Sequence, residues 1–400
     1  MRILFATPYY YPAFKFGGPP KKIHALSCGL AARGHQVHVL TFDFEKYNSR
    51  ERTNIEGVEV QYLPWVGSGL KQMPLGLSFI KDSAARADAV QCYGIYNLLS
   101  PIVAYIALRL NRPFVLEPLG MYPPRARNPF AKKAYNFLLT RWMMRHAAAV
   151  IAASEAEAAE LKAIASEKKI VYRRNGIDVS ALANLPSGEG LRKKWAISPG
   201  QKVVLYVGRL SPIKNLEQLI LAFAKADLRN SRLILVGPIL EPPYEARLRS
   251  LIATLRIEAS VLIAGPLYDE EQRAALALAD VFVLPSLNES FGNAAAEAVA
   301  AGVPVLLTET CGIAPLINER AGLSVPLGVA SLASGLRTMI DDPARRDQLV
   351  ARRAEVIREL SWEEPIRQTE ELYLSIIERS KVASKTHNEI NSGRGGTMRL

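Results

Sequence analysis

Residues Ala279 to Pro304 read ADVFVLPSLNESFGNAAAEAVAAGVP and carry the clearest structural signal in the chain. The run Val281–Leu284 is short, β-branched and apolar, which is typical of a buried strand. A polar loop then leads through Phe291-Gly292-Asn293 into an alanine-rich helix that stops at Gly302. A buried strand, a turn and a helix in this order form one βα unit of a parallel sheet.

The same alternation continues in both directions from this stretch. It predicts an α/β fold with two doubly wound, Rossmann-like domains whose sheets face each other across a cleft. The stretch Leu182–Gly200 is rich in Pro and Gly, which is typical of a linker. We therefore expect an N-terminal domain over 1–185, a linker over 186–200, a C-terminal domain over 201–360 and, after further helix, a disordered tail over 381–400.

Composition limits the class of protein. The chain has 400 residues, of which 49% are hydrophobic and 22% charged, so a cored two-domain protein fits better than a disordered chain or a coiled coil. The longest apolar stretch, Leu98–Leu108, is interrupted by Ser and Pro and is too short to cross a bilayer. Without a signal-peptide pattern, and with three widely spaced cysteines, a cytoplasmic location is expected.

The net charge of +12 is unevenly distributed, because residues 1–186 carry +11 and the rest carry +1. Either the N-terminal half meets an anionic partner, such as an acidic membrane face or a phosphorylated acceptor, or its surface simply has surplus lysines. The segment Asn128–Ala148 is amphipathic and basic. The default interpretation is a helix that packs on the core with its cations in solvent, and the alternative is a helix that contacts an anionic membrane surface. A nucleic-acid partner is not expected, since no stacking-aromatic or recognition-helix pattern accompanies the charge.

The helix after Phe291 begins in a way that suits an anion. Unpaired N–H groups of Gly292, Asn293 and Ala294, together with the helix dipole, form a phosphate site that Gly292 keeps free of a Cβ. Glu289 precedes this helix and Glu297 lies about two turns inside it. Because a carboxylate accepts hydrogen bonds from paired sugar hydroxyls, the two suit a ribose and a hexose on either side of a diphosphate.

A second motif is VVLYVGRLSPIKNL, residues 203–216. The strand delivers Gly208 and Arg209 at its carboxyl end, Lys214 follows in the loop, and Asn215 is expected to cap the next helix. A planar Arg fork and a Lys point charge suit a diphosphate and would stabilise it as a leaving group. The alternative is two surface cations near a turn.

The first βα turn offers a weaker signal. Gly17-Gly18 precedes a Pro-Pro pair, so its amides would face a phosphate or an acceptor oxygen, although a simple turn explains it equally well. Phosphate-binding glycine motifs of ATPases and dinucleotide enzymes, Asp-x-Asp and the usual zinc spacings do not occur. No metal or other cofactor is therefore expected.

Together these motifs resemble retaining GT-B glycosyltransferases of family 4, the glycosyl transferases group 1. The resemblance runs from the Gly17-Gly18 loop through SEAEAAEL (Ser154–Leu161) and RRNGIDVSAL (Arg173–Leu182) to the two motifs above. It implies transfer of a hexose from a UDP- or GDP-linked sugar to a glycan or lipid-linked acceptor, in lipopolysaccharide or other cell-surface glycan synthesis, with the peripheral contact at the inner membrane face. It also implies that a helix over 361–380 returns to the N-terminal domain.

The resemblance assigns roles residue by residue. Arg209, Lys214 and Glu289 would be the catalytic groups, the first two on the donor diphosphate and Glu289 at the donor sugar. Glu297 would bind the ribose and Leu267 would pack on the base. The remaining donor contacts would come from Gly208, Ser290, Phe291, Gly292, Asn293 and Ala294, and the acceptor or phosphate loops from Gly17, Gly18 and Gly120.

One position departs from the family pattern. Members often place a His before the Gly that is Gly120 here, but this chain has Leu119. Glu117 is a weak replacement candidate and more readily a structural carboxylate, while His24, His35, His38 and His146 are expected to be packing or surface residues. A non-catalytic homologue that binds a sugar nucleotide or glycan as the partner of another transferase therefore remains the alternative to an active enzyme.

Overall fold

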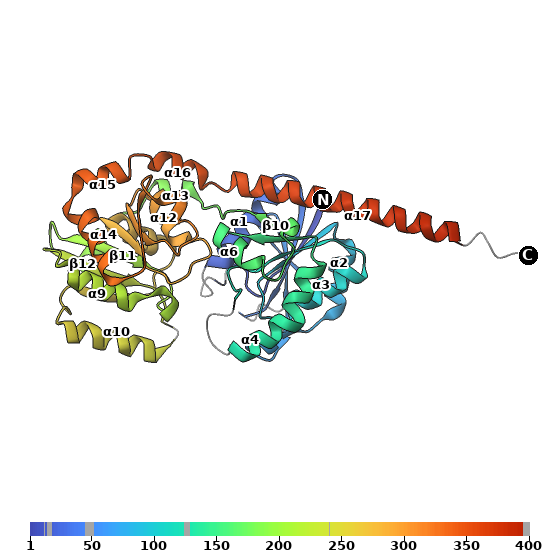
Figure 1. Cartoon of the computed structure of the whole chain (residues 1–400), viewed down its shortest axis with the longest axis horizontal. Helices are drawn as coiled ribbons and strands as arrows, with labels where there is room; N and C mark the ends of the chain where they lie inside the picture. Colours follow the sequence, from blue (N-terminus) through green and yellow to red (C-terminus); the bar gives the residue numbers. More distant parts are fainter. Residues whose placement is uncertain (12, 14–17, 45–51, 124–128, 240, 395–400) are drawn as a thin grey trace, which may run out of the picture. The chain divides into compact units, whose positions relative to one another are not determined.

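The computed structural model describes residues 1–11, 13, 18–44, 52–123, 129–239 and 241–394, with side chains as far as 382. The chain divides into two compact units (Figure 1). Unit 1 consists of Met1–Arg174 and Glu363–Leu400, and unit 2 consists of Asn175–Trp362. Each unit is built on a doubly wound sheet with helical connections, as the alternating pattern predicts.

Unit 1 has an eight-stranded sheet in the order β10-β9-β8-β7-β1-β2-β4-β3, parallel except for the antiparallel pair β3–β4. Its central strands are mostly apolar, with Gln91 and Glu117 as buried exceptions, because both of their faces are covered. The strands are β1 (Arg2–Ala6), β2 (Gln36–Phe42), β3 (Arg52–Ile55), β4 (Val58–Leu63), β7 (Ala89–Tyr93), β8 (Phe114–Glu117), β9 (Ala149–Ala152) and β10 (Ile170–Tyr172), with a separate pair β5 (Trp65–Val66) and β6 (Met73–Pro74). The helices are α1 (Gly18–Ala32), α2 (Leu77–Arg86), α3 (Leu99–Arg109), α4 (Pro129–Tyr135), α5 (Arg141–His146), α6 (Glu155–Leu161) and α17 (Glu363–Arg394).

Unit 2 has a six-stranded, fully parallel sheet in the order β13-β12-β11-β14-β15-β16. The order reverses between β11 and β14, and ligands of such sheets bind beyond the carboxyl ends of the strands at that switch point. The strands are β11 (Lys202–Val207), β12 (Ser231–Val236), β13 (Val261–Gly265), β14 (Val281–Leu284), β15 (Val305–Thr308) and β16 (Gly322–Val325). The helices are α7 (Val179–Ala183), α8 (Glu189–Lys194), α9 (Leu216–Ala226), α10 (Pro242–Leu255), α11 (Asp269–Leu278), α12 (Asn293–Ala300), α13 (Ala314–Ile317), α14 (Val329–Asp341), α15 (Pro343–Leu349) and α16 (Arg353–Glu359).

The linker expected over 186–200 is wrong. This segment contains α8 and lies within unit 2, where Leu191, Trp195 and Ile197 are buried. Those three apolar side chains anchor the segment to the core despite the surrounding Pro and Gly residues. The division between the units falls at Arg174/Asn175, eleven residues before the expected end of the first domain at 185.

The C-terminal helix α17 belongs to unit 1, and its first part covers the segment 363–380. It packs so closely on α1 that a Cβ on Gly29 would collide with Ile366. Glu370 also accepts hydrogen bonds from Arg33 and His35, at 2.9 and 2.7 Å. Helix α17 continues past 381 to Arg394, and no Pro and no Gly before Gly393 interrupts it; disorder of the tail stays a prediction.

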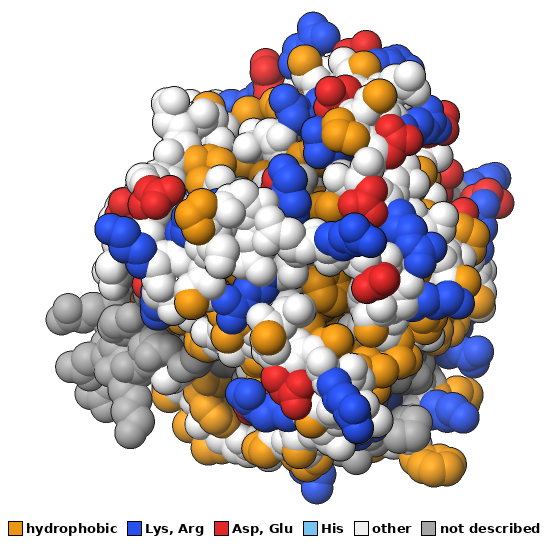
Figure 2. All heavy atoms as spheres, turned by 90° about the vertical axis from the view of Figure 1, so that its left-hand side faces the viewer, with side chains coloured by type: hydrophobic (Ala, Val, Ile, Leu, Met, Phe, Trp, Pro, Cys, Tyr) orange, Lys and Arg blue, Asp and Glu red, His pale blue; other side chains and the backbone are white. Residues whose placement is uncertain are grey.

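The surface of unit 2 reflects the near-neutral charge of its sequence. Figure 2 looks onto this unit, and Lys and Arg side chains are interspersed there with Asp and Glu. Within the residues that the structure describes, no helix combines the length and the apolar character needed to cross a membrane.

Candidate donor site in unit 2 and the buried ion cluster of unit 1

Glycines end three neighbouring strands of unit 2 at the carboxyl edge of the sheet. Gly208 follows β11, Gly237 follows β12 and Gly265 ends β13. A Cβ on Gly237 would collide with the carbonyl oxygen of Gly208, and one on Gly208 would lie 2.7 Å from the hydroxyl of Tyr206. The close approach of the two backbones requires glycine at 237, and the Tyr206 hydroxyl leaves no room for a Cβ at 208.

Tyr206 supports the loop that carries Arg209. Its buried hydroxyl donates a hydrogen bond to the carbonyl of Arg209, at 3.0 Å. Burial raises the pKa of Tyr206 well above its ordinary value, and the nearby negative charge of Glu289 raises it further. The Arg209 side chain itself is exposed and makes no ion pair with any residue that the structure describes. A fixed backbone with a free guanidinium suits an anionic ligand.

The loops after β11 and β14 are joined directly. The backbone N–H of Leu287 donates to the carbonyl of Ile213 at 2.9 Å, and the side chain of Asn215 donates to the carbonyl of Pro285 at 3.1 Å. Lys214 and Glu289 form an ion pair across the same junction, each side chain being 20% exposed. Two of the predicted catalytic residues, 75 positions apart, thus meet at the switch point.

The expectation that Asn215 caps a helix with its side chain is wrong. Asn215 occupies the position before α9 in a left-handed conformation, φ 59°, and makes no side-chain cap. Its amide is used instead to bridge the two loops. Pro285 is buried, so its carbonyl oxygen needs a hydrogen-bond donor inside the protein, and the Asn215 amide supplies it.

The Glu289 loop is also fixed from its other side. The N–H of Glu289 donates to the carbonyl of Thr310 at 3.2 Å, and the carbonyl of Glu289 accepts from Gly312 at 2.9 Å. The carbonyl of buried Phe291 accepts from Ile313 at 2.8 Å. The carboxylate of Glu289 is therefore presented by a backbone that is bonded on both sides.

Helix α12 begins beside this loop. Gly292 has φ 116°, a conformation that favours glycine, and a Cβ there would press on Ile313 at 3.0 Å. In the described ranges, the N–H groups of Gly292, Asn293 and Ala294 have no protein acceptor, while those of Ala295 and Ala296 bond to Gly292. The first turn of α12 therefore offers free donors and the positive end of the helix dipole, as the sequence predicts.

Glu297 and Leu267 lie on the neighbouring part of unit 2. Glu297 is half-buried in α12 and accepts a hydrogen bond from Gln272 of α11 at 3.1 Å. Leu267 is buried in the loop that leads into α11. Gln272 therefore links the helix that follows Leu267 to the predicted ribose-binding carboxylate. Ser290 is half-buried in the loop between Glu289 and α12.

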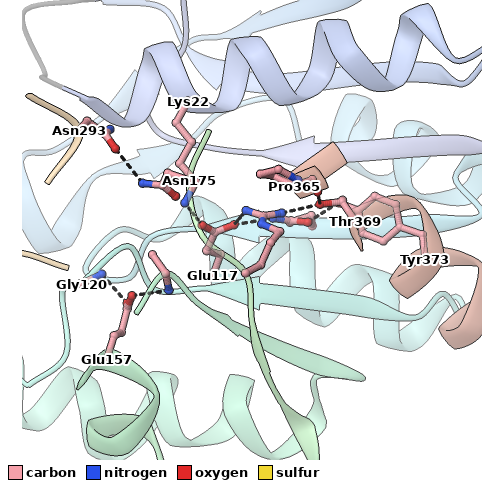
Figure 3. A network of polar contacts seen from close by, with 12 residues as sticks. Lys22, Glu117, Gly120, Glu157, Asn175, Asn293, Pro365, Thr369 and Tyr373 are labelled. Atoms are coloured by element: carbon pink, nitrogen blue, oxygen red, sulfur yellow. Dashed lines mark hydrogen bonds and ion pairs between the residues drawn. The ribbon is translucent and has the colours of Figure 1, made fainter. Parts of the chain in front are cut away.

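Sequence reasoning missed several residues of this site. Asn175 is buried, and its side-chain Nδ2 donates a hydrogen bond to Oδ1 of Asn293 at 3.0 Å (Figure 3). The side-chain oxygen Oδ1 of Asn175 has no partner among the described residues. Tyr206, Gly237 and Gln272 were also not selected. The repeated strand-Gly pattern of VGR and VGP is a sequence signal for Gly237, whereas the partners of Asn175 and Gln272 are set by tertiary packing alone.

The predicted acceptor loops lie in unit 1. Gly17 is outside the described residues, and Gly18 is the first residue of α1. Gly120 has φ 71°, and its N–H donates to the carboxylate of Glu157 at 2.6 Å (Figure 3). Because this amide already donates a hydrogen bond within the protein, it is not a free donor for a ligand. Gly120 instead supplies the positive φ that its loop requires.

Glu117 is the centre of a buried ion cluster, which we define as Lys22, Glu117 and Arg173 (Figure 3). All three side chains are at most 4% exposed, and Glu117 pairs with both cations. Burial by itself would raise the pKa of Glu117, but the charges of Arg173 and Lys22 outweigh it and hold the pKa below its ordinary value. Glu117 is therefore a structural carboxylate and not the replacement for the missing histidine.

The cluster ties α17 to the sheet of unit 1. Arg173 donates to Thr369 at 2.8 Å, and Gln91 donates to Glu117 at 2.9 Å and accepts from Tyr373. Each charged group thus has a charged or hydrogen-bonding partner, which burial demands.

Two family models match the chain, and together they cover most of both units. "Glycosyl transferase 4-like domain" matches residues 17–176, and "Glycosyl transferases group 1" matches residues 188–356. Among curated relatives, a D-inositol 3-phosphate glycosyltransferase of Kineococcus radiotolerans is 28% identical over 89% of this chain and 90% of its own. A glycogen synthase of Mycobacterium tuberculosis is 26% identical over 94% and 95%.

Solved structures give the same fold. Anabaena HepE, in complex with UDP and glucose, has a TM-score of 0.76 at 22% identity and covers 94% of this chain and 100% of its own. WaaG, a glycosyltransferase involved in lipopolysaccharide biosynthesis, has a TM-score of 0.67 at 19% identity over 92% and 99%. From its two family matches and its GT-B fold, the chain belongs to glycosyltransferase family 4, the glycosyl transferases group 1.

Proposed function

We propose that this glycosyltransferase moves a hexose from a UDP- or GDP-linked sugar to a glycan or lipid-linked acceptor, with retention of anomeric configuration, in cell-surface polysaccharide or glycolipid synthesis. The observation that carries the proposal is the junction of the β11 and β14 loops. There the Lys214–Glu289 pair stands at the switch point of a Rossmann-like sheet, and the β14 loop leads directly into the free amides of α12. These are the groups that a sugar diphosphate needs: cations, exposed N–H donors and a carboxylate.

The donor diphosphate binds to Arg209, Lys214 and the first-turn amides of α12. Both cations stabilise the charge that develops on the phosphate as the bond to the sugar breaks. In the structure the Lys214 ammonium pairs with Glu289. When the donor binds, its phosphate replaces Glu289 as the partner of Lys214, and the Glu289 carboxylate then accepts hydrogen bonds from the hydroxyls of the sugar. Glu297 binds the ribose and Leu267 packs against the base. The diphosphate of HepE's ligands, UDP and UDP-glucose, is the kind of group this arrangement suits.

Proton transfer from the acceptor does not require the missing histidine. Leu119 has no titratable group, and Glu117 is buried between two cations. In the proposed reaction, the acceptor hydroxyl attacks the anomeric carbon from the face that the diphosphate leaves, and the leaving phosphate oxygen takes the hydroxyl proton. The bond from carbon to phosphate oxygen breaks as the new glycosidic bond forms, without a metal.

A peripheral contact with an anionic membrane is part of the proposal. Phe130, Phe137 and Leu138 are 83%, 68% and 65% exposed on the segment from α4 to α5. Arg141, whose guanidinium lies 5.8 Å from the centre of the Phe137 ring, lines a surface hollow of about 360 Å³ together with Arg145 and Lys169, among others. Exposed apolar side chains beside basic groups favour an interface with anionic headgroups. Co-sedimentation with anionic but not zwitterionic vesicles, weakened by Phe137→Ser with Leu138→Ser, is the expected result.

The decisive experiment is transfer and donor hydrolysis over a panel of nucleotide diphosphate sugars. Glu289→Gln is expected to lower kcat by at least roughly 100-fold, because it removes the charge next to the reacting sugar. Glu270→Gln, an exposed change in the first turn of α11, serves as the matched control and leaves kcat unchanged. NMR of the product's anomeric proton tests retention.

The second candidate, a non-catalytic homologue, is favoured only by Leu119. It predicts that a nucleotide diphosphate sugar raises the melting temperature without any turnover in the panel. Turnover in the wild type that Glu289→Gln abolishes would exclude it, whereas turnover of Glu289→Gln within threefold of wild type would remove the role given to Glu289.

A further inference from the structure

We propose that Glu157 of helix α6 is a positioning residue for the acceptor, because its buried carboxylate fixes the turn Leu119–Gly120 at the carboxyl end of β8. The turn in turn presents an apolar surface to the acceptor. The inference rests on the proposed function, in which the loop after β8 is one of the acceptor loops. Ligands of parallel sheets bind beyond the carboxyl ends of the strands, which is where this loop lies.

Glu157 accepts two backbone hydrogen bonds, one on each carboxylate oxygen. Oε1 accepts from the N–H of Gly120 at 2.6 Å (Figure 3), and Oε2 accepts from the N–H of Ala153 at 2.9 Å. Ser154 caps α6 by accepting from the N–H of Glu157 at 3.1 Å, so the two residues have the spacing of a capping box. In a capping box the glutamate would bond back to the N–H of the serine. Here its oxygens join the loops after β8 and β9 instead.

The carboxylate of Glu157 is costly to bury. The residue is 4% exposed and forms no ion pair with any residue that the structure describes. Burial raises the pKa of Glu157, although the bonds from Ala153 and Gly120 counteract it. A glutamine of the same shape would avoid the cost of a buried charge, but it would offer one acceptor oxygen to two N–H donors. The need to hold both loops therefore explains the carboxylate.

The bond from Gly120 holds an unusual turn. Leu119 and Gly120 are both left-handed, with φ 60° and 71°. Glycine adopts this conformation freely, whereas leucine does so only where the surrounding structure imposes it. The N–H of Gly120 belongs to the peptide group that joins the two residues. By accepting from it, Glu157 fixes the orientation of that group and with it the conformation of Leu119.

The turn places the side chains of Leu119 and Met121 against the end of β7. A Cβ on Gly94, the residue after β7, would lie 3.5 Å from Met121 Cε and 3.8 Å from Leu119 Cδ1. Both side chains are half-buried, so each keeps some surface open. They form an apolar surface over the carboxyl ends of two neighbouring parallel strands. Such a surface suits the C–H face of an acceptor sugar ring rather than its hydroxyls.

The test compares Glu157→Gln with Glu155→Gln, a change at an exposed position of the same helix. Full-length protein is assayed with the donor panel and with octyl hexosides as acceptors, and the pair that the wild type turns over fastest is used. Glu157→Gln is expected to raise the KM for the acceptor roughly 10- to 100-fold, with kcat changed by less than about threefold. The Kd of the nucleotide diphosphate should stay within about twofold, because the donor groups belong to unit 2. A merely structural role would lower the melting temperature and leave the acceptor KM as in the control.

Hydrogen–deuterium exchange gives a second readout that needs no acceptor. Glu157→Gln is expected to speed exchange in the peptide that carries Leu119–Tyr122 by at least roughly 10-fold, while strand β8 stays protected. Leu119→Asn is the complementary variant, because asparagine tolerates the left-handed conformation and replaces only the apolar side chain. It is expected to raise the acceptor KM without speeding exchange.

Each outcome bears on the proposal. Exchange in Glu157→Gln as slow as in Glu155→Gln overturns it, and so does faster exchange with an acceptor KM that matches the control. If Glu157→Gln does not fold, Leu119→Asn decides, and an acceptor KM equal to that of the wild type overturns the proposal. Wild-type protein that transfers to none of the acceptors contradicts the proposed function, which is a distinct result, and the exchange measurement still decides whether Glu157 holds the turn.

Discussion

Glu117→Gln replaces the only anion of the buried ion cluster with a neutral group of the same shape. In the wild type, Glu117 is 1% exposed and neutralises both Lys22 and Arg173, whose side chains are 4% and 1% exposed. The variant leaves both buried cations without an ion pair, and Lys22 keeps only the weaker electrostatic attraction of buried Glu157. Breaking a buried pair in this way costs about 3–5 kcal/mol, because the remaining charge is neither solvated nor paired.

The loss should appear in the unfolding of unit 1. For a domain of its size, about 2–4 °C of melting temperature corresponds to 1 kcal/mol, so a shift of roughly 6–20 °C is expected. Scanning calorimetry is the appropriate measurement, since a two-unit chain can unfold in two transitions and only one should move. Glu155→Gln, an exposed glutamate of the same unit, is the control and should change the unfolding free energy by less than about 0.5 kcal/mol.

The pH dependence gives an independent check. Burial holds the pKa of Lys22 below its ordinary value, and Glu117 counteracts this. Without Glu117 the pKa falls further, and a lysine whose pKa is lower in the fold than in the unfolded chain destabilises the fold as pH drops below its unfolded pKa. The deficit of Glu117→Gln relative to the control should therefore shrink between about pH 7 and pH 10.

Two results would refute the reasoning. A melting temperature of Glu117→Gln within 2 °C of the control would mean that the two cations are solvated or paired elsewhere. A deficit that does not change with pH would mean that Lys22 is not the group left uncompensated. Adding Lys22→Met to Glu117→Gln should recover part of the loss, because it removes one of the two stranded charges.

Three further changes test the donor site. Gly208→Ala is expected to destabilise unit 2 by about 1–3 kcal/mol in chemical denaturation, because the new Cβ would lie 2.7 Å from the Tyr206 hydroxyl, whereas Gly190→Ala, with nothing within 4 Å, should not destabilise. Asn215→Ala should cost about 1–3 kcal/mol by leaving the Pro285 carbonyl without a donor, and an unchanged denaturation midpoint would show that this bridge contributes nothing. Arg209→Ala should weaken nucleotide diphosphate binding roughly 10- to 100-fold in calorimetric titration, with a smaller dependence on salt and no change in melting temperature.

Much of unit 2 is predictable because its signals are local. The apolar run Val281–Leu284, the positive φ of Gly292 and the alanine-rich helix after it all follow from the conformational preferences of neighbouring residues. The meeting of Lys214 and Glu289 is predictable as well, since the carboxyl ends of parallel strands share one edge of the sheet. The roles of these residues in transfer remain predictions.

Other features depend on partners that no local pattern reveals. The segment 186–200 has a linker's composition, yet the burial of Trp195 and its neighbours makes it part of unit 2. Asn215 has the sequence position of a helix cap, but a buried carbonyl 70 residues away takes its amide.

By itself, the sequence determined the βα units and the family, because hydrophobic periodicity and glycine conformation act over a few residues, whereas the switch point between β11 and β14 came from the tertiary structure. Only the tertiary structure decided that Glu117 lies between Lys22 and Arg173. In this cluster the energy comes from charges that the fold brings together from separate elements, and such distances are fixed by the packing of whole elements.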